Sequence, residues 1–110
     1  MTRALLSPKA ENDLDAHCAY IAVDNPEAAL RVRKVILATA DFLAQNPEIG
    51  KRIRNSGTRH RQIRWLVVPK FRNYLIFYQA HRETILVIRV LHAAQDWTRF
   101  FGSREEPASE

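Results

Sequence analysis

Two helix-start signals near the N-terminus constrain the fold of this chain more than any other feature. Ser7-Pro8 and Asn25-Pro26 each place a capping side chain directly before a proline, and this order is typical of the first turn of a helix. Apolar residues then recur at helical spacing, and Asn46-Pro47 stops the second segment. The sequence predicts helices over residues 8–23 and 26–45, with a link so short that they form an antiparallel hairpin. The predicted apolar faces consist of Ala10, Leu14, His17/Cys18 and Ile21 in the first helix and of Ala29, Val32, Ile36, Ala40 and Leu43 in the second.

Strand-forming segments surround this helix pair. Residues 73–80 and 84–92 are rich in Ile, Leu, Val, Phe and Tyr, which is typical of strands, and the polar residues between them predict a hairpin. The segment at residues 48–58 carries two glycines and is predicted to be a loop. The sequence therefore predicts an α+β fold, with the helix hairpin packed on one face of a small antiparallel β-sheet. The predicted order is strand (3–6), two helices, three strands (60–68, 73–80 and 84–92) and a short C-terminal helix at about residues 95–101.

The length of 110 residues is enough for one domain with one modest core. We expect this domain to span residues 1–101 and residues 102–110 to form a disordered polar tail. The single cysteine, Cys18, excludes an internal disulfide and suggests a reducing compartment. The chain has no apolar run of membrane-spanning length and its first residues lack a signal peptide pattern, so we expect a cytoplasmic protein. The scattered histidines and one cysteine do not have the spacing of a zinc site.

The charge of the chain is distributed unevenly. Residues 1–50 hold five basic and seven acidic side chains and so carry a net charge of −2. Because the whole chain has a net charge of +5, residues 51–110 carry +7. Residues 51–72 contain eight basic side chains and no acidic one. A soluble surface usually mixes the two signs, so this block indicates an acidic partner such as nucleic acid or an acidic protein segment.

Four residues of the C-terminal half are candidates for metal-free RNA cleavage. Such a reaction needs a proton acceptor, a proton donor and a cation beside the phosphate. His92 has the right chemistry to transfer protons, Arg72 and Arg89 to bind phosphate, and Tyr78 to donate a hydrogen bond. A three-residue loop from His81 to Glu83 would place Arg72 opposite His92, whereas a two-residue loop would bring Arg72 and Arg89 together. Neither register gathers all four residues on one face of the sheet, which weakens the nuclease interpretation.

Several motifs of the chain, taken in order, resemble a known family. The segments LSPKAENDLDAHCAYIAVDNPEAALR, FLAQNPEIGKR, KFRNYLIFYQA and ILVIRVLHAAQDW resemble the RelE/ParE toxin superfamily, specifically its ParE-like branch, over about residues 4 to 97. The resemblance implies a toxin of a type II toxin–antitoxin system that acts without a cofactor and is neutralised by a cognate antitoxin in a hetero-oligomer. RelE-like members cut mRNA on the ribosome, whereas ParE-like members inhibit DNA gyrase.

The resemblance also separates these two activities. RelE-like nucleases carry an arginine, a second arginine and a tyrosine at positions that correspond here to Leu75, Ala94 or Gln95, and Phe100 or Phe101. The resemblance therefore favours a gyrase inhibitor that acts by binding. The alternatives are a ribosome-dependent mRNA endonuclease using Arg72, Arg89, His92 and Tyr78, and a non-toxic module that only binds the antitoxin. The candidate residues for binding target or antitoxin are Arg52, Arg54, Arg59, Arg61, Arg64, Lys70, Arg72, Arg89 and Trp97.

Overall fold

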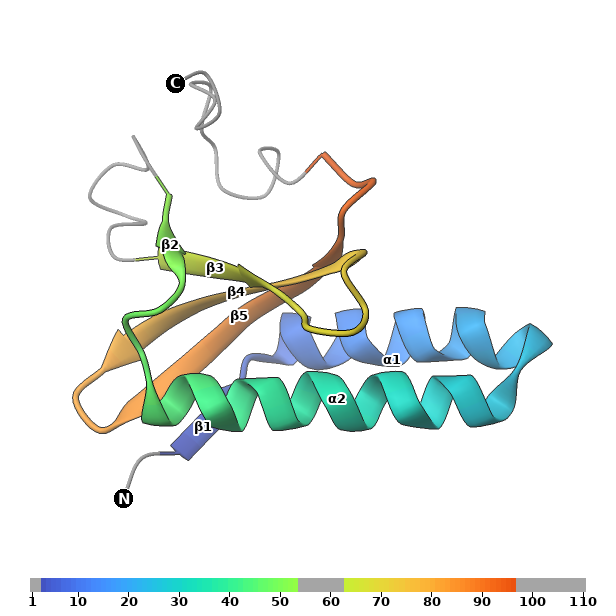
Figure 1. Ribbon diagram of the computed structural model, residues 1–110, viewed down its shortest axis with the longest axis horizontal. Helices are drawn as coiled ribbons and strands as arrows, with labels where there is room; N and C mark the ends of the chain where they lie inside the picture. The colour runs from blue at the N-terminus through green and yellow to red at the C-terminus, as the bar shows by residue number, and fades with distance from the viewer. Residues whose placement is uncertain (1–2, 54–62, 97–110) are drawn as a thin grey trace.

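The computed structural model describes residues 3–53 and 63–96, and it confirms the α+β class. Figure 1 shows two long helices lying side by side on one face of a twisted sheet. Neither described helix combines the length and the apolar character that a membrane span requires. The elements are β1 (Arg3–Leu6), α1 (Pro8–Asp24), α2 (Pro26–Gln45), β2 (Lys51–Arg52), β3 (Ile63–Val67), β4 (Tyr74–His81) and β5 (Thr84–His92).

Both predicted helix starts are confirmed by their capping bonds. The Ser7 Oγ accepts from the Ala10 N–H at 3.0 Å, and the Asn25 Oδ1 accepts from the Ala28 N–H at 3.0 Å. Asn25 also ends α1, because its own N–H donates to the Ile21 carbonyl at 2.9 Å. One residue therefore closes the first helix and opens the second, which forces the antiparallel hairpin seen in Figure 1.

The sheet has five strands in the order β1-β5-β4-β3-β2 and differs from the expectation in two places. The edge strand β1 runs parallel to β5, while the other pairings are antiparallel. Ser7 helps to fix this direction, since its N–H donates to the Val87 carbonyl at 2.9 Å and its Oγ to the Ile88 carbonyl at 2.8 Å. The two residues of β2 lie in the segment predicted to be a loop, and they pair with β3. Two residues are too few to show a strand periodicity in the sequence.

The hairpin between β4 and β5 follows neither of the two predicted registers. Its loop is Arg82-Glu83, and Arg82 adopts a positive φ of 49°. His92 pairs with Tyr74, and Arg89 pairs with Phe77. The pairing shifts by one residue beyond this point, where Tyr78 faces Val87. Ile88 is thus an extra residue in β5, a β-bulge that no count from the loop alone can anticipate.

The main core lies between the helix hairpin and the sheet. Leu14, Ile36 and Leu43 from the helices are almost fully buried there against Ile76 and Val90 from the sheet. The predicted helix faces are confirmed at these positions, and burial raises the pKa of the Cys18 thiol on α1. A second apolar cluster on the other side of the sheet comprises Ile53, Ile63, Leu75, Phe77 and Leu91. Most of the predicted C-terminal helix and the whole predicted tail lie outside the described residues.

Candidate functional site

The hydroxyl of Tyr78 is used inside the fold. Tyr78 is fully buried, and its hydroxyl donates to the Pro47 carbonyl at 2.9 Å and accepts from the Gly50 N–H at 2.9 Å. Burial raises the pKa of Tyr78, while the Gly50 N–H and the Arg64 charge oppose that shift. A side chain at residue 50 would put its Cβ 2.5 Å from this hydroxyl, so the position requires glycine. Tyr78 therefore anchors the segment that leads from α2 to β2.

Arg64 supports the same segment from the neighbouring strand. It pairs with Tyr78 in the ladder between β3 and β4. Its guanidinium donates to the Gly50 carbonyl at 2.8 Å and to the Glu48 carbonyl at 3.2 Å. Arg64, predicted as a partner contact, thus has an intramolecular role that places β2 at the edge of the sheet.

Arg89 forms a bidentate ion pair with Asp13 of α1. The Nε and Nη2 atoms of Arg89 donate to the two carboxylate oxygens of Asp13 at 2.7 and 2.8 Å. The Val90 N–H, two residues after the bulge residue Ile88, donates to the same carboxylate at 2.9 Å. The Arg89 and Asp13 side chains are only 16% and 13% exposed, and hydrogen bonding to Asp13 raises the pKa of Arg89. The predicted phosphate-binding arginine therefore links α1 to β5.

His92 and Arg72 lie at the same end of the β4–β5 pair. The His92 Nδ1 accepts from the Ala94 N–H at 3.0 Å, and the ring packs edge-on against Tyr74 with 5.1 Å between centroids. Arg72 is exposed in the turn before β4, next to Asn73, whose carbonyl accepts from the Ala93 N–H at 2.6 Å. Of the four nuclease candidates, the structure brings these two to one end and engages the other two elsewhere.

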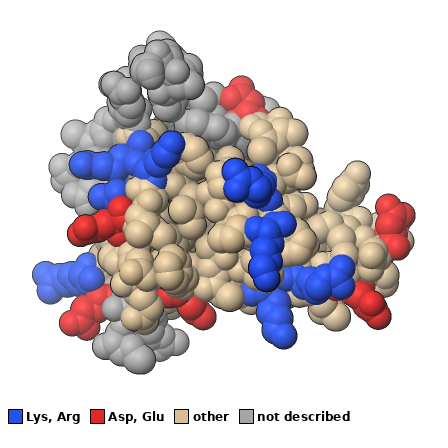
Figure 2. Space-filling model, viewed as in Figure 1, with Lys and Arg blue, Asp and Glu red and all other residues tan. Residues whose placement is uncertain are grey.

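The predicted basic surface is present where the structure describes it. Lys51, Arg52, Lys70 and Arg72 are exposed, and the Lys51 ammonium lies 5.8 Å from the centroid of the Trp65 ring, a cation–π contact. Figure 2 shows basic side chains gathered over the middle of α2 and the turn between β3 and β4. The predicted contacts Arg54, Arg59, Arg61 and Trp97 lie outside the described residues.

Helix α2 contributes to this surface, which was not predicted from the sequence. Arg31 and Lys34 are exposed on that helix, outside the contiguous charge block. Arg31, Val35, Ala38 and Phe42 follow one another at intervals of three or four residues. This spacing puts them on one face of the helix, so the sequence could have predicted a stripe of basic and apolar side chains on α2.

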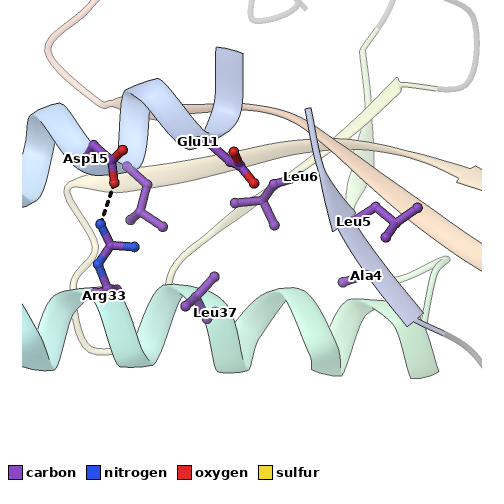
Figure 3. Close-up of a pocket in the computed structure, with 8 residues that line it drawn as sticks. Ala4, Leu5, Leu6, Glu11, Asp15, Arg33 and Leu37 are labelled. Carbon is purple, nitrogen blue, oxygen red and sulfur yellow. Dashed lines mark hydrogen bonds and ion pairs between the residues drawn. The ribbon is translucent and has the colours of Figure 1, made fainter. Parts of the chain in front are cut away.

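Two hollows flank α2. One, of about 560 Å³, lies between β1, α1 and α2; Figure 3 shows Leu5, Leu6 and Leu37 beside it and the exposed Arg33–Asp15 ion pair at its edge. The other is a groove of about 510 Å³ between α2 and β3, here called the α2–β3 groove. Its lining consists of Val35, Ala38, Thr39, Phe42, Ile49, Leu66, Val67, Pro69 and Lys70. It is thus almost wholly apolar, with one lysine at the end formed by the β3–β4 turn.

Three comparisons with known proteins agree with one another. A family model described as "ParE toxin of type II toxin-antitoxin system, parDE" matches residues 4–97. A protein of Sinorhizobium fredii named "Putative toxin Y4kP" is 36% identical over 89 residues, which cover 81% of this chain and 85% of that protein. A solved structure titled "Chromosomal ParDE TA system from P. aeruginosa" matches with a TM-score of 0.65 and 22% identity, covering 84% of this chain and 96% of that one. The structural match shows a shared fold.

Proposed function

Because this chain belongs to the ParE toxin family of type II toxin–antitoxin systems, we propose that it inhibits DNA gyrase by binding and that a cognate antitoxin neutralises it. In this proposal the toxin meets gyrase and the antitoxin in the cytoplasm. The toxin and the antitoxin form a hetero-oligomer. The inhibited state is a gyrase complex with cleaved DNA. The toxin favours that state because it binds it more tightly than the resealed one.

The observation that carries this proposal is that two of the four nuclease candidates, Tyr78 and Arg89, are engaged in the fold. A proton donor for RNA cleavage must release its proton to the leaving oxygen, but the buried Tyr78 hydroxyl donates its proton to the Pro47 carbonyl. A phosphate-binding arginine must present its guanidinium to solvent. In Arg89, the Nε and Nη2 atoms already donate hydrogen bonds to the Asp13 carboxylate at 2.7 and 2.8 Å. These contacts favour a toxin that acts through its surface.

The surface we assign to the target is the edge of the sheet at β2. Lys51 and Arg52 are exposed there, and Tyr78 and Arg64 hold the preceding backbone through the four hydrogen bonds described above. Two exposed cations at a sheet edge can attract a phosphate backbone or an acidic protein segment. Binding through these charges weakens as salt rises.

The test is a DNA cleavage assay with purified gyrase and supercoiled plasmid. The wild-type chain is expected to produce linear DNA after detergent and protease treatment. The double variant Lys51→Glu/Arg52→Glu should need at least about tenfold more protein for the same cleavage, since it replaces two favourable charges by two unfavourable ones. Lys9→Glu, which reverses an exposed charge in the first turn of α1, serves as the matched control and should behave as wild type.

Two results would count against the proposal. If wild-type protein leaves the plasmid supercoiled and uncut, the gyrase target is wrong. If it instead cleaves mRNA on translating ribosomes, the endonuclease alternative replaces it. A chain that does neither but still binds its antitoxin would be the non-toxic binding module.

A further inference from the structure

Four basic side chains gather where the turn between β3 and β4 lies against the middle of α2. The turn and the helix are neighbours, because Lys70 and Val35 line the same hollow. Figure 2 shows basic side chains over both regions on one face of the molecule. We call this surface the α2–turn patch, and its members are the exposed residues Arg31, Lys34, Lys70 and Arg72.

The patch contains no acidic side chain that would balance its charge. Helix α2 has no aspartate or glutamate between residues 28 and 40, and the chain has none between residues 49 and 82. Glu27 lies one helical turn before Arg31. Even so, no ion pair within residues 3–53 and 63–96 includes any of the four cations. Their charges are therefore available to an anionic ligand.

Lys70 has a backbone conformation that lysine rarely adopts. Its φ is 74°, in the left-handed region that glycine occupies freely and other residues enter at a cost in energy. Two hydrogen bonds fix the shape of the turn. The Val68 N–H donates to the Tyr74 carbonyl at 2.9 Å, and the Tyr74 N–H donates to the Phe71 carbonyl at 3.0 Å. A lysine at a position that favours glycine indicates that its charge is used in binding.

The arrangement of the four cations favours an extended anion as the ligand. They come from a helix and a turn and are all exposed, whereas a site for a free phosphate gathers its donors in one concavity. Duplex DNA carries one negative charge per about 1.7 Å of its length. Interfaces with DNA are rich in positive charge, whereas interfaces between proteins have few charged residues at their centre. The composition of the patch therefore fits DNA better than an acidic protein segment.

We propose that the α2–turn patch binds the phosphate backbone of duplex DNA without reading its sequence. The arginines bind phosphate oxygens through their forked guanidinium groups, and the lysines add point charges beside them. This inference goes beyond the proposed function, because the chain binds DNA through the patch without gyrase. The patch shares no residue with the β2 edge that we assign to the target, so variants can distinguish the two surfaces.

Binding of the full-length chain to a short fluorescent duplex of mixed sequence, measured by anisotropy over a range of salt concentrations, tests the site. Each phosphate contact contributes about −0.9 to the slope of log K against log salt concentration, so the four cations should contribute about −3.6. Lys70→Gln/Arg72→Gln should weaken binding by about tenfold or more at about 0.1 M salt and make the slope shallower by about 1.8.

A second patch variant and a matched control complete the experiment. Arg31→Gln/Lys34→Gln should have the same effect as the turn variant, and because it changes the helix, a local defect in the turn cannot explain both results. Lys51→Gln/Arg52→Gln is the control, since it also removes one exposed lysine and one exposed arginine, here from the β2 edge. It should change the affinity less than about threefold, because charges separated by more than about 10 Å are largely screened at this salt concentration.

Three results would overturn the inference. The first is a wild-type chain that does not bind the duplex even at low salt. The second is a loss of affinity in the β2 control as large as that in either patch variant. The third is a pair of patch variants that bind the duplex like wild type and lose affinity for a cognate antitoxin, which would assign the patch to a protein partner. The plasmid cleavage assay with gyrase tests the proposed function separately, so the failure of one proposal can be told from the failure of the other.

Discussion

Replacing Asp13 by alanine should destabilise the fold far more than the same change at Asp15, two residues along the same helix. Asp13 accepts three hydrogen bonds, two from Arg89 and one from the Val90 N–H. Its side chain is 13% exposed and that of Arg89 is 16% exposed. Asp15 pairs with Arg33 in an ion pair whose side chains are 66% and 40% exposed.

The expected magnitude follows from these contacts. Removing one partner of a buried ion pair costs about 3–5 kcal/mol, because the other charge loses its compensation. Arg89 retains some access to water, so we expect a loss of about 3 kcal/mol from the free energy of unfolding. An exposed pair contributes at most about 1 kcal/mol. Both aspartates lie in the interior of α1, so the gain in helix propensity that alanine brings is shared and cancels in the comparison.

Urea unfolding followed by circular dichroism measures this difference. Asp13→Ala should lower the free energy of unfolding by about 3 kcal/mol and the melting temperature by about 12 °C or more for a domain of this size, whereas Asp15→Ala should change the melting temperature by less than about 5 °C. The double variant Asp13→Ala/Arg89→Ala should cost little more than Asp13→Ala alone, since both changes remove the same interaction. Equal losses for Asp13→Ala and Asp15→Ala would refute the structural role of the Arg89–Asp13 pair.

Two further predictions concern the anchor formed by Tyr78 and Gly50. Gly50→Ala should destabilise the fold by about 1–3 kcal/mol in the same unfolding assay, because the new Cβ would lie 2.5 Å from the Tyr78 hydroxyl; an unchanged free energy of unfolding would show that the anchor can move. Burial raises the pKa of Tyr78, so the folded chain holds this proton more tightly than the unfolded chain does. The resulting stability is complete below the unfolded pKa of about 10 and is lost as pH rises through the folded pKa, and Tyr78→Phe should remove this part of the alkaline dependence; a variant that loses stability above pH 10 as steeply as wild type would contradict this role.

The helices could be predicted from the sequence because their signals are local. Ser7 and Asn25 bond to backbone groups three residues away, so the capping residue and the helix lie within one short stretch of sequence. The apolar stripes follow the same rule, since side chains three and four residues apart share a face of the helix.

The errors arose where distant residues decide the structure. The bulge at Ile88 is stabilised by Ser7 and Asp13, more than 70 residues earlier in the chain, and no pattern within the β4–β5 hairpin contains that information. Arg89 and its partner Asp13 are 76 residues apart, so the sequence did not indicate their ion pair. Tyr78 and Gly50 are 28 residues apart, and only the fold shows that the tyrosine hydroxyl and the glycine backbone meet.

The sequence predicted the candidate surfaces only where their residues are close together in the chain. A contiguous basic block at residues 51–72 is visible in the sequence, and Lys51, Arg52, Lys70 and Arg72 are exposed as expected. The α2–β3 groove combines residues from a helix, a strand and a turn, so no single stretch of the sequence contains its lining. Arg64 belongs to the basic block but does not serve only as surface charge, because its guanidinium donates hydrogen bonds to backbone carbonyls of the chain itself.

The central claim is that this ParE-family toxin acts by binding gyrase and not by cutting RNA. The most direct measurement compares the wild-type chain with Arg72→Ala/His92→Ala, which removes the two nuclease candidates left at one end of the β4–β5 pair. Both proteins are given purified gyrase with supercoiled plasmid and, in parallel, translating ribosomes with mRNA. The account predicts linear plasmid with both proteins and intact transcripts with both. Transcripts cut by the wild-type chain and spared by the double variant would contradict it.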